Sequence, residues 1–115
     1  MNKLIILLLF CLLVVLPVLA QALSEAEVTA TMYRAFELQK AKRYSDALNA
    51  FLIVGANVDA NKSEVERQMY VCSQTMACAC YYSMKRYSEG YQLTQKLISS
   101  KFKERAVSFI KVNGM

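Results

Sequence analysis

The feature that most constrains this chain is a six-residue segment that occurs twice, at residues 42–47 and 85–90. The first copy reads Lys-Arg-Tyr-Ser-Asp-Ala, and the second reads Lys-Arg-Tyr-Ser-Glu-Gly, 43 residues later. Each copy lies between two stretches whose apolar residues recur at helical spacing, so we expect each to be the turn of a helical hairpin. A repeat with a period of 43 residues predicts antiparallel helical hairpins that stack on one another.

The spacing of apolar residues predicts five helices after residue 22, and hence an all-α fold. The first is expected over about residues 25–41, the third from about residue 62 to about residue 84, and the fifth over about 102–111. The second and fourth are expected to begin at Ser45 and Ser88, because hydroxyl side chains commonly cap helices.

Two pairs of residues have the spacing of a capping box, in which each side chain bonds the main-chain amide of the other residue. Ser24 and Glu27 precede the first helix, and Asn61 and Glu64 precede the third, after a polar loop at 57–61. The third helix also carries an apolar stripe, which consists of Val65, Met69, Cys72 and Met76. We therefore expect this helix to bury one face along its whole length.

Residues 1–22 have the pattern of a signal peptide. Lys3 gives a positive start, residues 4–16 carry no charge, and Ala20-Gln21-Ala22 fits the small-x-small pattern that a signal peptidase accepts. This predicts a helical domain at residues 23–115 in a periplasmic or secreted protein. The alternative is an uncleaved inner-membrane anchor, because the 19 residues from Leu4 to Ala22 are just long enough to span a bilayer.

The charge pattern argues against a nucleic-acid partner. The chain has 14 Lys and Arg against 9 Asp and Glu, a formal net charge of +5, but charges of both signs are interspersed and no basic run reaches five residues. Interspersed charge is typical of a solvated surface, whereas nucleic-acid binding usually needs a concentrated basic patch. Any contact with a membrane is expected only through residues 1–22.

The residues around each copy of the repeated segment follow one pattern of small and large side chains. The first copy provides Ala35, Leu38, Tyr44, Ala47, Phe51 and Val54, and the second provides Cys78, Tyr81, Tyr87, Gly90, Thr94 and Leu97. In this pattern the chain resembles the tetratricopeptide repeat (TPR) family. Small residues in that motif let two helices approach closely, and larger ones fill the space beside them. The resemblance implies a short TPR-like solenoid.

The sequence departs from the family pattern in two ways. The family period is about 34 residues, so about nine residues are extra here, and we place them at the start of the third helix. Thr94 also stands where the motif has an aromatic residue.

In the TPR family, protein partners bind in a groove lined by the first helix of each hairpin. The resemblance therefore implies a protein- or peptide-binding groove, formed by Met32, Phe36, Gln39, Lys40, Thr75, Tyr82 and Ser83. The other interpretation is that Met32 and Phe36 pack within the domain or against a missing neighbour. A looser resemblance is to the secreted, repeat-bearing sensory regions of bacterial membrane sensors. The alternative function is therefore that of an N-terminal sensing fragment of a larger sensor protein.

The composition excludes several kinds of catalytic site. The chain has no histidine, which removes Ser-His and Cys-His nucleophile pairs and every histidine-containing metal site. Its three glycines belong to no phosphate-binding loop. We therefore expect a non-enzymatic protein without a cofactor or a metal.

Three cysteines follow residue 22, and all lie in the third predicted helix: Cys72, Cys78 and Cys80. If that helix is continuous, Cys72 and Cys80 lie about 12 Å apart along its axis, whereas a disulfide needs Cα atoms within about 7 Å. We expect reduced, buried thiols that act as small core residues. A disulfide to another chain remains an alternative.

Overall fold

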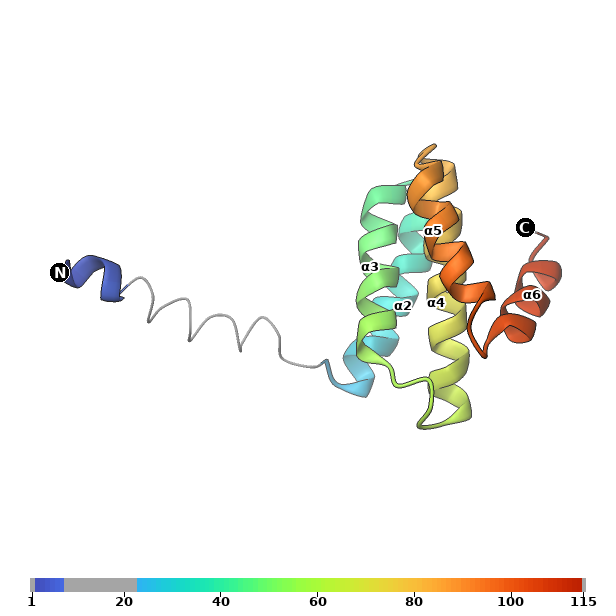
Figure 1. Ribbon diagram of the computed structural model, residues 1–115, viewed down its shortest axis with the longest axis horizontal. Helices are drawn as coiled ribbons and strands as arrows, with labels where there is room; N and C mark the ends of the chain where they lie inside the picture. The colour runs from blue at the N-terminus through green and yellow to red at the C-terminus, as the bar shows by residue number, and fades with distance from the viewer. Residues whose placement is uncertain (1, 8–22, 115) are drawn as a thin grey trace.

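The computed structural model describes residues 2–7 and 23–114, and in these ranges it is all-α, as predicted. After residue 23 the chain forms α2 (Glu25–Lys40), α3 (Tyr44–Asn57), α4 (Glu64–Ser83), α5 (Tyr87–Ile98) and α6 (Lys103–Val112). Figure 1 shows α2 to α5 side by side, with α6 beyond α4 and α5. None of the described helices is long and apolar enough to cross a membrane. The predicted signal peptide lies mostly outside the described residues.

Each helix packs against the next one in the row, and α4 lies at the centre. α2 contacts α3, α3 contacts α4, and α4 contacts both α5 and α6. The buried residues of α4 run from Val71 to Cys80 and include the polar residues Ser73, Gln74 and Thr75. This part of α4 therefore has little free surface, because neighbours cover it on several sides.

The core consists of two clusters. The larger joins α2, α3 and α4, and its buried members are Ala35, Ala47, Leu48, Ala50, Phe51, Met76, Ala77 and Cys80. The smaller joins α4, α5 and α6 through Val71, Leu97 and Ala106, with Tyr70 and Phe102 packed beside them. The second cluster helps to hold α6 against α4 and α5, since apolar burial is the main stabilising contribution in such a contact.

The first copy of the repeated segment ends α2 in a Schellman turn. The N–H of Lys42 donates to the carbonyl of Gln39 (2.9 Å), and the N–H of Arg43 donates to the carbonyl of Leu38 (2.9 Å). Lys42 adopts φ 61°, the left-handed conformation that this motif requires and that glycine usually supplies. The chain then enters α3 at once.

The second copy forms the same turn between α4 and α5. Here Lys85 has φ 59°, its N–H donates to the carbonyl of Tyr82 (3.0 Å), and the N–H of Arg86 donates to the carbonyl of Tyr81 (2.9 Å). The two N-cap arginines, Arg43 and Arg86, have nearly the same backbone angles, φ −88° with ψ 67° and 64°. The sequence repeat is therefore also a geometric repeat.

The predicted serine caps of the second and fourth helices are wrong. These helices begin at Tyr44 and Tyr87, and neither has a side-chain cap. The Schellman turn brings the chain into helical geometry one residue before the serine. An ion pair occupies the first turn instead: Arg43 pairs with Asp46 (2.6 Å), and Arg86 pairs with Glu89 in the same way.

Of the two predicted capping boxes, one is confirmed and one is wrong. The capping box of Ser24 and Glu27 is confirmed, with both of its hydrogen bonds present. The box predicted at Asn61 and Glu64 is wrong, because Ser63 is the N-cap of α4 and its Oγ accepts from the N–H of Glu66 (3.1 Å). The start of the apolar stripe is also wrong: Val65 is 65% exposed, because the buried part of α4 begins only at Val71.

Most residues of the predicted repeat pattern lie where two helices meet. Ala35, Ala47, Phe51, Val54, Cys78, Gly90 and Leu97 are buried, and Leu38, Tyr44, Tyr81 and Thr94 are partly buried. A Cβ added at Gly90 would lie 3.0 Å from the ring of Tyr82, so this position needs a small residue. Tyr87 is the exception. It is 58% exposed and lies beside Tyr82 on the surface, so its predicted packing role is wrong.

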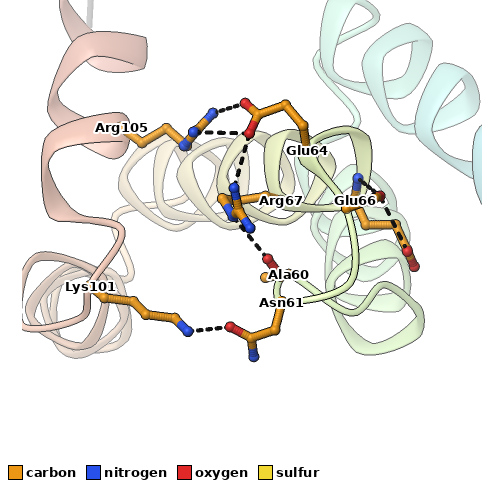
Figure 2. A network of polar contacts seen from close by, with 8 residues as sticks. Ala60, Asn61, Glu64, Glu66, Arg67, Lys101 and Arg105 are labelled. Atoms are coloured by element: carbon orange, nitrogen blue, oxygen red, sulfur yellow. Dashed lines mark hydrogen bonds and ion pairs between the residues drawn. The ribbon is translucent and has the colours of Figure 1, made fainter.

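A polar network connects α6 to the start of α4 (Figure 2). The guanidinium of Arg105 on α6 binds the carboxylate of Glu64, which also pairs with Arg67 (3.0 Å). Nε of Arg67 donates to the carbonyl of Ala60 (3.1 Å), and Lys101 contacts Asn61. The Arg105 hydrogen bond holds the pKa of the Glu64 carboxyl below its usual value. The network therefore adds a charged contact to the apolar one that holds α6.

The first residue of the described domain is also fixed by a hydrogen bond. The main-chain N–H of Leu23 donates to Oδ1 of Asn57 (2.9 Å), the last residue of α3, and Nδ2 of Asn57 donates to the carbonyl of Ile53 (2.8 Å). The start of the domain is thereby attached to the far end of the first hairpin.

Candidate functional site

A hollow of about 350 Å³ lies between α4, α5 and α6, and its walls are almost entirely apolar. Its lining residues are Thr75, Cys78, Ala79, Tyr82, Thr94, Leu97, Ile98 and Ile110. We call it the α4–α5–α6 pocket. Its volume lies within the range of small-ligand sites, about 300–1,000 Å³. α6 contacts α4 and α5 through the second cluster and the polar network, and its Phe109 packs against the larger cluster. Space remains beside Ile110, and this space is the pocket.

The hydroxyl groups in this pocket already have partners within the protein. Thr75 Oγ1 donates to the carbonyl of Val71 (2.7 Å), and Thr94 Oγ1 donates to the carbonyl of Gly90 (2.7 Å). The Tyr82 hydroxyl lies 3.1 Å from Thr94 Oγ1 and must be the donor in that contact, because the single proton of Thr94 is already used. These three hydroxyls therefore have no proton left to donate to a ligand.

The cysteines are free thiols, and α4 is continuous through all three, as predicted. Cys80 lies in the larger core cluster, whereas Cys78 faces the pocket. Burial raises the pKa of Cys72 and of Cys80 to about 11. Burial also raises the pKa of Cys78. At neutral pH the three groups are therefore protonated thiols, which are poor nucleophiles.

The structure divides the predicted groove residues between two places. Met32, Phe36, Gln39 and Lys40 lie along one side of α2. Met32 packs against the larger core cluster, and the Phe36 ring contacts the Phe51 ring edge-on, with their centroids 5.2 Å apart. Phe36 nevertheless remains 36% exposed, and Lys40 is exposed at the last turn of the helix.

The α4 residues of the predicted groove lie elsewhere. Thr75 is only 3% exposed, so the prediction that it lines an open groove is wrong; it lies in the α4–α5–α6 pocket, beside residues of α5 and α6. Tyr82 is 40% exposed and lines the α4–α5–α6 pocket with Thr75, and Ser83 is exposed at the end of α4. The hollows that α4 residues line are shared with α5 or α6, and one of them also with α3; a further hollow is lined by α2 residues alone.

Sequence reasoning placed some pocket residues in the core, assigned Thr75 and Tyr82 to the predicted groove, and missed the others. Cys78, Thr94 and Leu97 were predicted as packing residues, while Ala79, Ile98 and Ile110 were not connected with one another. An apolar face on the fifth predicted helix could have indicated a contact with the second hairpin. The repeat pattern could not reveal the pocket, because the pocket depends on the angle at which α6 packs across α4 and α5.

Within the described ranges, no group of three or more His, Cys, Asp or Glu side chains is placed to hold a metal ion. No protein-family model, curated protein or solved structure matches this chain.

Proposed function

We propose that this chain is a non-enzymatic, TPR-like helical-repeat module that binds a protein or peptide partner. The observation that carries the proposal is the repeated turn. Two segments 43 residues apart adopt the same backbone geometry and bring small residues, Ala47 and Gly90, to equivalent helix contacts. Repeats of this kind usually form scaffolds that present an extended binding surface.

The proposed partner surface is the side of α2 that carries Phe36, Gln39 and Lys40. α2 is at the end of the row of helices and packs mainly against α3, so this side is only partly covered. Phe36 offers an aromatic edge supported from below by Phe51, and Lys40 offers a cation beside it. Aromatic residues, Phe included, are enriched at protein interfaces.

The state of the polar side chains supports binding rather than catalysis. The pocket hydroxyls are engaged with main-chain carbonyls or with each other, and burial keeps the thiols protonated. Catalytic nucleophiles instead need an adjacent base or a lowered pKa.

We further propose that residues 1–22 are removed on export, which places the domain in the periplasm or outside the cell. The support is the charge and small-residue pattern of this segment.

A matched pair of charge reversals tests the partner surface. Lys40→Glu changes α2, and Lys96→Glu is the control on α5, since both lysines are exposed and lie in the last turn of a helix. Proteins cross-linked to each variant in cells are compared by quantitative mass spectrometry. We expect a partner to be depleted at least about tenfold by Lys40→Glu and retained by Lys96→Glu. Equal recovery of every cross-linked protein with both variants would contradict the proposed surface.

A further inference from the structure

The α4–α5–α6 pocket is a second site, independent of the proposed partner surface on α2. Its lining belongs to a different end of the row of helices, and it shares no residue with Phe36, Gln39 or Lys40. An apolar hollow of about 350 Å³ leaves hydrocarbon surface in contact with water. Filling it with an apolar group is favourable, because that surface is then removed from water.

The polar groups of the pocket restrict what can enter it. A peptide segment carries main-chain N–H and C=O groups that need partners when buried. Thr75, Tyr82 and Thr94 have already used their protons, so they offer no donor to a carbonyl or a carboxylate inside the pocket. The only donor left in the lining is the S–H of Cys78, which is weak. We therefore expect the part of a ligand that enters to be hydrocarbon.

The charges on the surrounding helices indicate the other end of the ligand. Residues 87–114, which include α5 and α6, carry five Lys and Arg against two Glu. Arg105 and Lys101 are engaged at the start of α4, whereas Lys111 is exposed and directly follows the pocket residue Ile110. An anionic head group that stays at the surface is attracted by this positive excess, whereas a cationic one is repelled. An alkyl chain with a carboxylate at one end meets both requirements.

We propose that the α4–α5–α6 pocket binds the alkyl chain of a medium-chain fatty acid, or of a similar anionic amphiphile, with the head group at the surface. Ala79 and Cys78 of α4 form one wall, Leu97 and Ile98 of α5 form the second, and Ile110 of α6 forms the third. Tyr82, which is partly exposed, lies at the edge of the pocket.

The test is a series of saturated fatty acids from hexanoate to dodecanoate, used below their micellar concentrations with the full chain. Each added methylene is expected to tighten binding about three- to fourfold until the chain fills the pocket, after which the affinity levels off. Binding is followed by NMR through the methyl groups of Ile98 and Ile110, because residues 1–22 are themselves apolar and would also attract fatty acids. Shifts at these two methyl groups with a plateau in chain length are the expected result.

A size change in the pocket supplies the matched comparison. Ala79→Phe places a ring inside the pocket, and Ala30→Phe places the same ring on the exposed face of α2. We expect Ala79→Phe to move the plateau to a shorter fatty acid and to weaken decanoate binding at least about tenfold, whereas Ala30→Phe changes neither. Decyltrimethylammonium, which has the same chain with a cationic head, is expected to bind more weakly than the fatty acid of equal chain length.

Three results would overturn the proposal. The first is the absence of shifts at Ile98 and Ile110 with any fatty acid, and the second is affinity that rises with chain length without a plateau. The third is tighter binding of N-acetyl-leucinamide than of decanoate at the same methyl groups, which would make the pocket a receptor for a partner's side chain. If Ala79→Phe does not fold, spin-labelled decanoate is added to the unsubstituted chain and the broadening of methyl NMR signals is measured. Broadening confined to the methyl signals of Ile98 and Ile110 supports the site, and equal broadening of the Val65 methyl signals excludes it.

Discussion

Lys42 and Lys85 hold a backbone conformation that costs an L-residue about 1–2 kcal/mol and that glycine adopts freely. Replacing either lysine by glycine removes this strain, although the unfolded chain gains some freedom in exchange. We expect Lys42→Gly and Lys85→Gly each to raise the free energy of unfolding by about 0.5–1 kcal/mol. Urea denaturation followed by circular dichroism measures it.

The control for these two changes is Lys96→Gly, within α5. The same replacement inside a helix should lower stability by up to about 1 kcal/mol. A loss of stability with Lys42→Gly or Lys85→Gly would show that the two turns do not require the left-handed conformation in solution.

Ala47 is completely buried where α2 and α3 meet, so a larger charged side chain has no space there. Ala47→Glu buries an unpaired carboxylate, which costs several kcal/mol. A domain of this size has only about 5–15 kcal/mol of total stability. We therefore expect the first hairpin to unfold or to melt far below the unsubstituted protein, whereas Ala30→Glu on the exposed side of α2 should melt normally. Equal melting curves would exclude this helix contact.

The three thiols of α4 are expected to react slowly in the folded protein. Their raised pKa values keep them protonated at neutral pH, and reactivity should increase only as the pH rises toward about 11 for Cys72 and Cys80. A thiol reagent at pH 7.5 should label the folded domain little, and label all three cysteines after denaturation without a reductant. One label instead of three would indicate an intramolecular disulfide and a break in α4.

At the scale of elements, α6 depends on a charged contact as well as an apolar one. The pKa of Glu64 is lowered in the folded state, mainly by Arg105, so this contact stabilises the domain above the usual carboxyl pKa and is lost as the pH falls through the lowered value. Glu64→Gln should increase hydrogen exchange in α6 a few-fold at pH 7. The difference from the unsubstituted protein should vanish in acid, where Glu64 is itself protonated.

The matched control for α6 is Glu89→Gln. Glu89 also pairs with an arginine, but its partner, Arg86, is three residues away in the same turn. This change should leave exchange in α6 unaltered. Equal exchange in α6 for Glu64→Gln and the unsubstituted protein would mean that the apolar cluster holds the helix alone.

The positions of the helices could be predicted from the sequence because each depends on local spacing. α2 and α6 begin and end within about one residue of expectation. The prediction that Ser45 and Ser88 cap helices was wrong, because each Schellman turn makes the next helix begin one residue earlier. The general preference for hydroxyl residues at N-caps carries no information about the preceding turn. About nine residues beyond the TPR period were expected to lengthen the start of the third predicted helix. α4 has 20 residues and α2 has 16, so only four of these residues lengthen the helix.

For the whole molecule, the arrangement of helices limited what could be foreseen. The pattern of small and large residues located the contacts within each hairpin, for example at Ala35 and Ala47. It did not show that Thr75 and Ala79 would line a pocket with residues of α5 and α6. Such features depend on contacts between helices far apart in the chain, and one sequence carries no periodic signal for them.

Export is the prediction that belongs to the whole chain. Mass spectrometry of the protein recovered from outside the cytoplasm should give the mass of residues 23–115, with Leu23 as the first residue. The control replaces Ala20 and Ala22 with bulky residues, which should block cleavage, so that the protein keeps its full mass. An exported protein that retains residues 1–22 would instead be anchored through them.

The hydrogen bond between Leu23 and Asn57 would take on a new role in the processed protein. Cleavage after Ala22 would turn the Leu23 amide into an α-ammonium group, so its contact with Asn57 Oδ1 would become charge-assisted and stronger. Aminopeptidases need a free, extended terminus, and a terminus held against the end of α3 is a poor substrate. The cut that releases the domain would then also protect its new end from trimming, so the lifetime of the protein outside the cytoplasm would depend on one asparagine.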